Sequence, residues 1–131
     1  MKLVTTEPGS KEARTSITNL LRKGYSFYTV DIALAESLNA IWKHVKIHKD
    51  LKTEGVKSAI QDLTKIHDKL NILTTRELSE ETTDIALTQN ITIYDSLYIA
   101  ATRKLKATLY TADRKLCNMS KKIISSKLLK P

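Results

Sequence analysis

The order of hydrophobic patterns along the chain predicts one α/β domain in which helices cover both faces of a parallel sheet. Short segments rich in β-branched and aromatic residues alternate with longer segments of helical periodicity. Strand–helix–strand units of this kind are right-handed and place their strands parallel, which gives a three-layer α/β/α arrangement. The 131 residues contain no repeat or internal linker, so we expect a single domain spanning residues 1–131.

The first half of the chain contains the clearest helix boundaries. Ser10 is a typical N-cap for a helix over residues 10–21, and Gly24 suits the turn that ends it. The following segment, YSFYTV (residues 25–30), has the composition of a strand. We expect Asp31 to cap a second helix, whose apolar residues recur at helical spacing: Leu34, Ala35, Leu38, Ile41, Trp42 and Val45.

The second half continues the alternation of helices and strands. The sequence predicts helices over 54–70, 77–89, 95–105 and 113–119, strands over 71–75 and 108–111, and a final strand or extended tail over 123–129. In open parallel sheets, ligands bind beyond the carboxyl ends of the strands. The residues that follow the strands are therefore the first candidates for a functional site.

The positive charge of the protein is concentrated at one end of the sequence. Residues 1–102 contain 13 basic and 13 acidic residues, whereas residues 103–131 contain nine basic residues and one acid, which accounts for the whole net charge of +8. A concentrated positive field attracts polyanions such as nucleic acid. A solvated lysine-rich tail explains the same pattern equally well.

Composition excludes several classes of protein. Hydrophobic residues make up 41% of the chain, but no run approaches the ~18 apolar residues that a membrane span needs. The first residues have no apolar core of signal-peptide length, so we expect a cytoplasmic protein without membrane contact. The single cysteine, Cys117, excludes an intrachain disulfide and suits a small buried side chain. The sequence also lacks a glycine-rich phosphate loop and a nucleophile elbow.

Three acids stand where the predicted strands end. Glu36 follows the strand over 25–30, Asp113 follows the strand over 108–111, and Asp95 opens the helix between them. Locally, each aspartate suits a helix N-cap, and Glu36 suits a solvated helix surface. A parallel sheet can bring all three to one edge, where clustered carboxylates favour a hard cation such as Mg²⁺ or Mn²⁺.

These segments resemble the PIN-domain ribonucleases, especially the VapC-like toxins of type II toxin–antitoxin pairs. The similarity rests on ALAESLNAIWKHV, which contains Glu36, and on TIYDSLYIAATRKLKATLYTADRKL, which contains Asp95 and Asp113 eighteen residues apart. The resemblance runs in order along nearly the whole chain. It implies a metal-dependent endoribonuclease in which Glu36, Asp95 and Asp113 hold Mg²⁺ or Mn²⁺ and Thr111 positions Asp113.

The resemblance also implies partners. RNA is the expected substrate, with basic residues near the site on its backbone: Arg114, Lys115, Arg103 and Lys104. A homodimer and a small antitoxin protein are the expected protein partners.

The start of the chain departs from the family pattern. The family begins with a strand that ends in Asp, followed by a helix that leads into Glu-Pro-Gly. Here only six residues precede Glu7-Pro8-Gly9, and LVTT (residues 3–6) is similar to the end of that helix, so we expect the first strand and its Asp to be absent. Three explanations stay open: a natural start upstream of Met1, a truncated variant with weakened metal binding, or a partner that supplies the strand.

The departure leaves two further functional hypotheses. In the second hypothesis, the chain is a catalytically impaired module that binds RNA or an antitoxin without cleavage, and the basic C-terminal region matters more than the acids. A fragment of an α/β domain without either activity is the third hypothesis.

Overall fold

A computed structural model of the chain describes residues 1–6 and 8–129. Five parallel strands form one sheet in the order β3-β2-β1-β4-β5. The strands are β1 (Lys2–Thr5), β2 (Ser26–Val30), β3 (Asn71–Leu73), β4 (Thr108–Thr111) and β5 (Ser125–Leu128). The helices are α1 (Lys11–Arg22), α2 (Ala33–Lys46), α3 (Val56–His67), α4 (Ser79–Gln89), α5 (Ile93–Leu105) and α6 (Arg114–Ser120), with a 3₁₀ turn at Thr53–Gly55.

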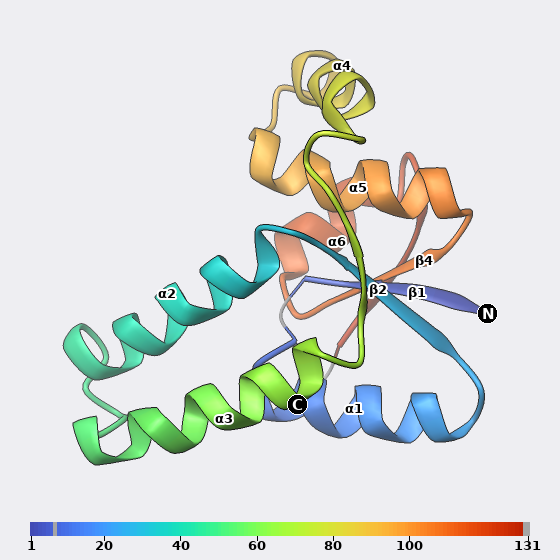
Figure 1. The fold of residues 1–131 in the computed structure, drawn as a ribbon. Helices are drawn as coiled ribbons and strands as arrows, with labels where there is room; N and C mark the ends of the chain where they lie inside the picture. Colours follow the sequence, from blue (N-terminus) through green and yellow to red (C-terminus); the bar gives the residue numbers. More distant parts are fainter. Residues whose placement is uncertain (7, 130–131) are drawn as a thin grey trace.

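The predicted three-layer architecture is confirmed (Figure 1). Successive side chains of a strand point to opposite faces, so each strand contributes to two cores. Leu3 and Phe27 pack with α1 and α3 on one face, whereas Val4, Val30 and Leu109 pack with α4, α5 and α6 on the other. Helix α5 is the most deeply packed helix, since every residue from Ser96 to Thr102 is buried.

The prediction that the first strand is absent was wrong. Residues 2–5 form β1 at the centre of the sheet, paired with β2 on one side and β4 on the other. The LVTT segment lies mainly in this strand because Leu3 and Val4 alternate between the two cores, which a strand allows and a helix end does not. The described residues between β1 and α1, which are residues 6 and 8–10, contain no helix.

Two predicted helix caps are confirmed and two are wrong. Ser10 accepts a hydrogen bond from the backbone N–H of Ala13, 3.1 Å away, and Asp113 caps α6. Asp31 does not cap α2; its carboxylate accepts hydrogen bonds from the backbone N–H and hydroxyl of Thr75, at 2.8 and 2.6 Å. Helix α5 begins earlier than predicted and is capped by Thr92, so Asp95 lies within its first turn.

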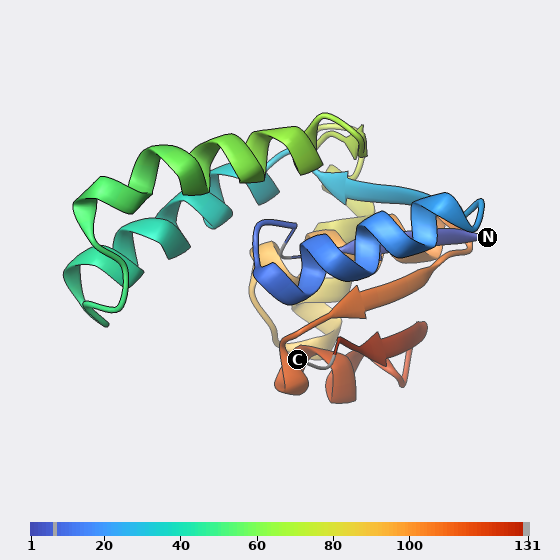
Figure 2. The ribbon, with the colours of Figure 1, turned by 90° about the horizontal axis from the view of Figure 1, so that it is seen from below.

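Helix α2 and helix α3 form a hairpin that extends beyond the carboxyl edge of the sheet (Figures 1 and 2). The apolar side predicted for α2 is only partly covered, since Ala33 is its one buried residue within the described chain. Trp42 keeps 52% of its surface exposed and Leu38 keeps 40%. The hairpin therefore forms one wall of the space beyond the strand ends.

No helix in the part of the chain that the structure describes is long and apolar enough to cross a membrane. Cys117 is buried, as its predicted core role requires.

Candidate active site

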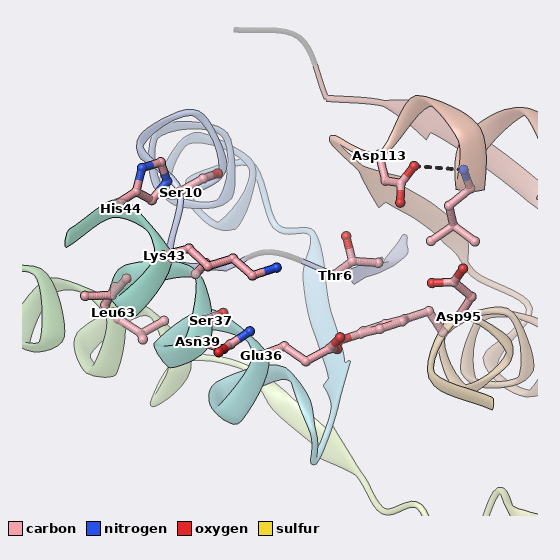
Figure 3. A pocket seen from close by; sticks show the side chains of 15 residues that line it. Thr6, Ser10, Glu36, Ser37, Asn39, Lys43, His44, Leu63, Asp95 and Asp113 are labelled. Atoms are coloured by element: carbon pink, nitrogen blue, oxygen red, sulfur yellow. Dashed lines mark hydrogen bonds between the residues drawn. The ribbon is translucent and has the colours of Figure 1, made fainter. Parts of the chain in front are cut away.

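A pocket of about 480 Å³ opens beyond the carboxyl ends of β1 and β4 (Figure 3). We call it the strand-end pocket. Helix α2 forms one side, and the first turns of α5 and α6 form the other. The residues that line it are Thr6, Gly9, Ser10, Glu36, Ser37, Asn39, Ala40, Ile41, Lys43, His44, Leu63, Asp95, Tyr98, Asp113 and Leu116. The three predicted acids thus come together in one pocket, although 77 residues separate the first from the last.

Asp113 is held in place by its own helix and by the strand before it. One carboxylate oxygen accepts a hydrogen bond from the backbone N–H of Leu116 at 3.0 Å. The hydroxyl of Thr111 accepts a hydrogen bond from the backbone N–H of Asp113 at 3.1 Å. The helix cap uses one oxygen, so the second oxygen is left to face the pocket (Figure 3).

Asp95 is a carboxylate in an unfavourable environment. Its pKa is raised above the ordinary value by partial burial first and by the negative charge of Asp113 second, while the ammonium group of Lys115 lowers it. Because Thr92 provides the cap of α5, the Asp95 side chain is not used for capping. The two aspartates therefore repel each other on one side of the pocket, and a bound cation would relieve that repulsion.

The end of β1 presents hydroxyl groups where the family pattern expects a carboxylate. Thr6, which follows the strand directly, is buried and forms a 2.8 Å hydrogen bond with the hydroxyl of Thr111. Thr5 is also buried, and its carbonyl accepts a hydrogen bond from the Thr29 hydroxyl. Glu7 of the Glu-Pro-Gly segment lies outside the described residues. The strand is present, and its last residue and the residue after it are Thr5 and Thr6 rather than the expected Asp.

Glu36 lines the pocket from α2 and already accepts a hydrogen bond there. Its carboxylate accepts a hydrogen bond of 2.6 Å from the hydroxyl of Tyr98, which lies three residues after Asp95 on α5. This contact joins the two walls of the pocket, since one partner belongs to α2 and the other to α5. Glu36 is exposed, so the contact leaves it open to solvent and to ligand.

The donor set suits a cation that takes part of its coordination from elsewhere. Within residues 1–6 and 8–129, no three histidine, cysteine or acidic side chains are grouped closely enough to hold a metal ion together. Mg²⁺, however, is commonly held by one or two carboxylates, with waters and substrate phosphates completing its octahedral shell. Asp95 and Asp113 fit that kind of site.

Comparison with known proteins identifies the family. The family model of the PIN domain matches residues 1–122. The chain belongs to the PIN-domain family. This confirms the family predicted from the residues around Glu36, Asp95 and Asp113.

Individual PIN relatives are distant in sequence. Ribonuclease VapC3 from Pyrobaculum aerophilum is 25% identical over 114 residues, which cover 87% of this chain and 83% of the relative. The crystal structure of PAE2754 from the same organism aligns with a TM-score of 0.72 and 22% identity, over 95% of this chain and 82% of that one.

A third relative is part of a complex. VapBC2 from Rickettsia felis, solved bound to a DNA fragment from their promoter, aligns with a TM-score of 0.63 and 16% identity, over 99% of this chain and all of that chain. These structural similarities establish the PIN-like fold of the chain.

The basic residues predicted to contact RNA separate into two groups in this PIN domain. Arg114 and Lys115 begin α6 beside Asp113 and are exposed. Arg103 and Lys104 lie at the far end of α5, where they pair with Glu81 at 2.6 Å and Glu77 at 3.9 Å. The structure therefore brings only the first pair close to the acids.

Most residues that line the pocket were not predicted from the sequence as site residues, and three of them are polar side chains of interest: Thr6, Lys43 and Tyr98. Tyr98 belongs to the family-like motif around Asp95, and a largely buried tyrosine hydroxyl usually finds a partner. Lys43 lies seven residues after Glu36, a spacing that returns to the same helix face, and this was a usable signal.

Proposed function

We propose that this protein is a divalent-metal-dependent endoribonuclease. The observation that carries the proposal is the pair formed by Asp95 and Asp113, which reach one pocket from two elements and repel each other there. Membership of the PIN family and the similarity to a ribonuclease support the proposal.

The residues of the pocket have distinct roles in the proposal. Asp95 and Asp113 hold Mg²⁺ or Mn²⁺, and Glu36 contributes a third carboxylate at the same pocket. When bound, a divalent cation supplies activation of water and neutralisation of charge on the phosphoryl oxygens. Thr111 positions Asp113 through the hydrogen bond to its backbone N–H.

Arg114 and Lys115 complete the proposed site by contacting the RNA backbone. Both lie at the start of α6, next to Asp113, and neither takes part in an ion pair within residues 1–6 and 8–129. Lysine and arginine side chains beside an acidic metal site attract the phosphodiester, which the acids alone would repel.

The test is cleavage of a labelled single-stranded RNA by the full chain in Mn²⁺, in Mg²⁺ and in EDTA. We expect cleavage with a divalent cation and none in EDTA, and we expect an otherwise identical DNA strand to be cut more slowly or not at all. Equal cleavage in EDTA would contradict the metal site. Faster cleavage of DNA would contradict the substrate.

A second candidate function is RNA binding without cleavage. The observation in its favour is the pair of threonines at the end of β1, where a carboxylate would complete the cation site. Binding that weakens steeply with salt, without product under any divalent cation, would favour this second function over the first.

We also propose a small antitoxin protein as a partner and a homodimer as the assembly. Proteins similar to this chain have been solved as VapBC2 from Rickettsia felis and as FitAB bound to a DNA fragment. The exposed Trp42 and Leu38 on α2 offer apolar surface for a protein contact. Light scattering of the purified chain tests the assembly, since a monomer at micromolar concentration would exclude a stable homodimer.

A further inference from the structure

The strand-end pocket is electrically polarised. Two of its three acids lie on one side: Asp95 is in the first turn of α5, and Asp113 is the N-cap of α6. Lys43 lies across the pocket on α2, and Figure 3 shows its side chain extending from the helix into the pocket toward Thr6. Helix α2 also contributes Glu36, so a substrate that spans the pocket meets two carboxylates at one side and both a carboxylate and the Lys43 ammonium group at the other.

Lys43 has no anionic partner within the described chain. The ion pairs there join Arg14 with Asp62, His44 with Asp50, and the two bases at the end of α5 with residues of the α4 region. His44 also lines the pocket, but it hydrogen-bonds with Asp50 at 2.8 Å. Lys43 is thus a cation in a pocket with three acids that pairs with none of them, and its charge stays available for a bound anion.

Lys43 and Glu36 lie at different points along helix α2. Seven residues along an α-helix correspond to a rise of about 10 Å. The two side chains share one face of α2 and start about two turns apart, and the Lys43 side chain extends from its position toward Thr6. Because Lys43 starts from the other end of this wall, it can contact an anion other than the one that the acids and their cation would hold.

We propose that Lys43 binds a non-reacting phosphate of the RNA backbone, adjacent to the phosphate that is cleaved, and so fixes the direction in which the strand crosses the pocket. This proposal rests on the proposed ribonuclease function and names the group that positions its substrate. Lys43 is a positioning residue, because the phosphate that it binds does not react.

A simpler explanation for Lys43 is the favourable effect of a cation near the C-terminus of a helix. Lys46 lies in the same last turn and experiences the same helix dipole, but it does not line the pocket. Lys46→Gln is therefore a matched control for Lys43→Gln, and Lys43→Arg is the conservative variant that keeps the charge.

The first experiment measures RNA binding without cleavage. The probe is a fluorescein-labelled RNA of 12 nucleotides, titrated in EDTA at several salt concentrations and followed by anisotropy. We expect Lys43→Gln to weaken binding about fivefold and to reduce the salt slope by about 0.7, the value for one phosphate contact on a single strand. Lys43→Arg and Lys46→Gln should stay within twofold of the wild type. An equal loss in both glutamine variants would overturn the proposal.

The second experiment locates the phosphate. Each linkage of a four-nucleotide RNA is replaced in turn by a neutral methylphosphonate, and binding to the wild type and to Lys43→Gln is compared. One neutral linkage should weaken binding to the wild type but have no further effect on Lys43→Gln. If each neutral linkage weakened binding to the wild type and to Lys43→Gln by the same factor, the assignment would be overturned.

Both experiments are independent of turnover. Loss of binding in Lys43→Gln in a chain that never cleaves RNA would support the phosphate site while the ribonuclease function fails. If the chain does cleave RNA, Lys43→Gln should raise KM about fivefold and change kcat less than twofold.

Discussion

Two acidic regions of this molecule differ in how their charges are balanced. The strand-end pocket contains Glu36, Asp95 and Asp113. A second hollow, which we call the α4–α5 cluster, contains Glu77, Glu80, Glu81, Asp84 and Arg103. The second region has more acids, yet two of them form ion pairs with bases at the end of α5.

The aspartates of the strand-end pocket form no ion pair within residues 1–6 and 8–129. Asp95 has a raised pKa there, whereas the pKa of Glu77 in the α4–α5 cluster is lowered, chiefly by hydrogen bonds from Thr74. The number of acids therefore does not identify a cation site. Within the described residues, the absence of an ion pair at Asp95 and Asp113 distinguishes the strand-end pocket from the α4–α5 cluster.

The largest expected effect concerns the acids of the two regions. Asp95→Asn and Asp113→Asn should each lower the rate of Mn²⁺-dependent RNA cleavage about 10²-fold or more, because each removes charge stabilisation at the reacting phosphate. Glu77→Gln and Glu81→Gln remove acids of the α4–α5 cluster and should leave the rate unchanged. Single-turnover cleavage measures all four, and a comparable loss in Glu81→Gln would remove the distinction between the regions.

A carboxylate added to each region should have opposite outcomes. Thr6→Asp places an acid at the end of β1 and should tighten Mn²⁺ binding about tenfold, since a further charged ligand joins Asp95 and Asp113. Thr83→Asp adds the same charge to the exposed face of α4 and should create no cation site. Calorimetric titration with Mn²⁺ compares them.

Thr6→Asp also buries a charge, so it needs a control for folding. Without a cation it should lower the free energy of unfolding by about 1–3 kcal/mol, because the variant loses the hydroxyl contact with Thr111. Saturating Mn²⁺ should restore much of that loss, since a ligand that binds only the folded state stabilises it. No tightening of Mn²⁺ in a folded Thr6→Asp protein would contradict a cation site at the strand ends.

The contact between Glu36 and Tyr98 should have a smaller effect. Tyr98→Phe keeps the buried ring but removes the hydroxyl that donates to Glu36, so we expect cleavage to slow about three- to tenfold. Tyr94→Phe, at an exposed position one residue before Asp95, is the matched control and should be neutral. Equal rates for the two variants would show that the placement of Glu36 does not matter for cleavage.

The smallest expected effect is a change in thermal stability when an acid is neutralised. The sign of this change should differ between the two regions. The raised pKa of Asp95 means that the folded state binds its proton more tightly than the unfolded state does, so ionisation of Asp95 destabilises the fold above the unfolded pKa of about 3.9. Asp95→Asn should therefore raise Tm slightly at pH 7, and the gain should disappear in acid below that value.

Glu81→Gln should change stability in the opposite direction at pH 7, by less than about 1 kcal/mol, because it removes an exposed ion pair. Thermal melts of both variants at pH 7 and pH 3 without divalent cation make the comparison. A destabilised Asp95→Asn at pH 7 would contradict the repulsion between Asp95 and Asp113.

Local patterns in the sequence were sufficient for much of this fold. The helix started by Ser10 and the strand over 108–111 are determined by neighbouring residues, and both are confirmed. Asp113 was predicted both as a helix cap and as a site residue, and its two oxygens allow both roles. The sheet order then explains why Glu36 and Asp95 reach the same pocket.

The errors arose where distant residues decide the structure. Asp31 was predicted as a cap, but it bonds to Thr75, which is 44 residues away. The first strand was missed because residues 2–5 are too few for a clear period, and their pairing with β2 and β4 determines them. The role of Lys43 depends on the direction in which α2 leaves the sheet, which no local pattern specifies.

The two walls of the pocket differ in how easily they open locally, because one wall belongs to the hairpin of α2 and α3 and the other belongs to α5. Helix α2 buries only Ala33 within the described chain, whereas α5 buries seven consecutive residues. Segments with few buried contacts open at lower free energy than the global unfolding transition. The amide protons of α2 should therefore exchange with solvent well before those of α5. The hydrogen bond between Glu36 and Tyr98 joins the two walls, so Asp95 and Asp113 should stay in place when α2 opens locally.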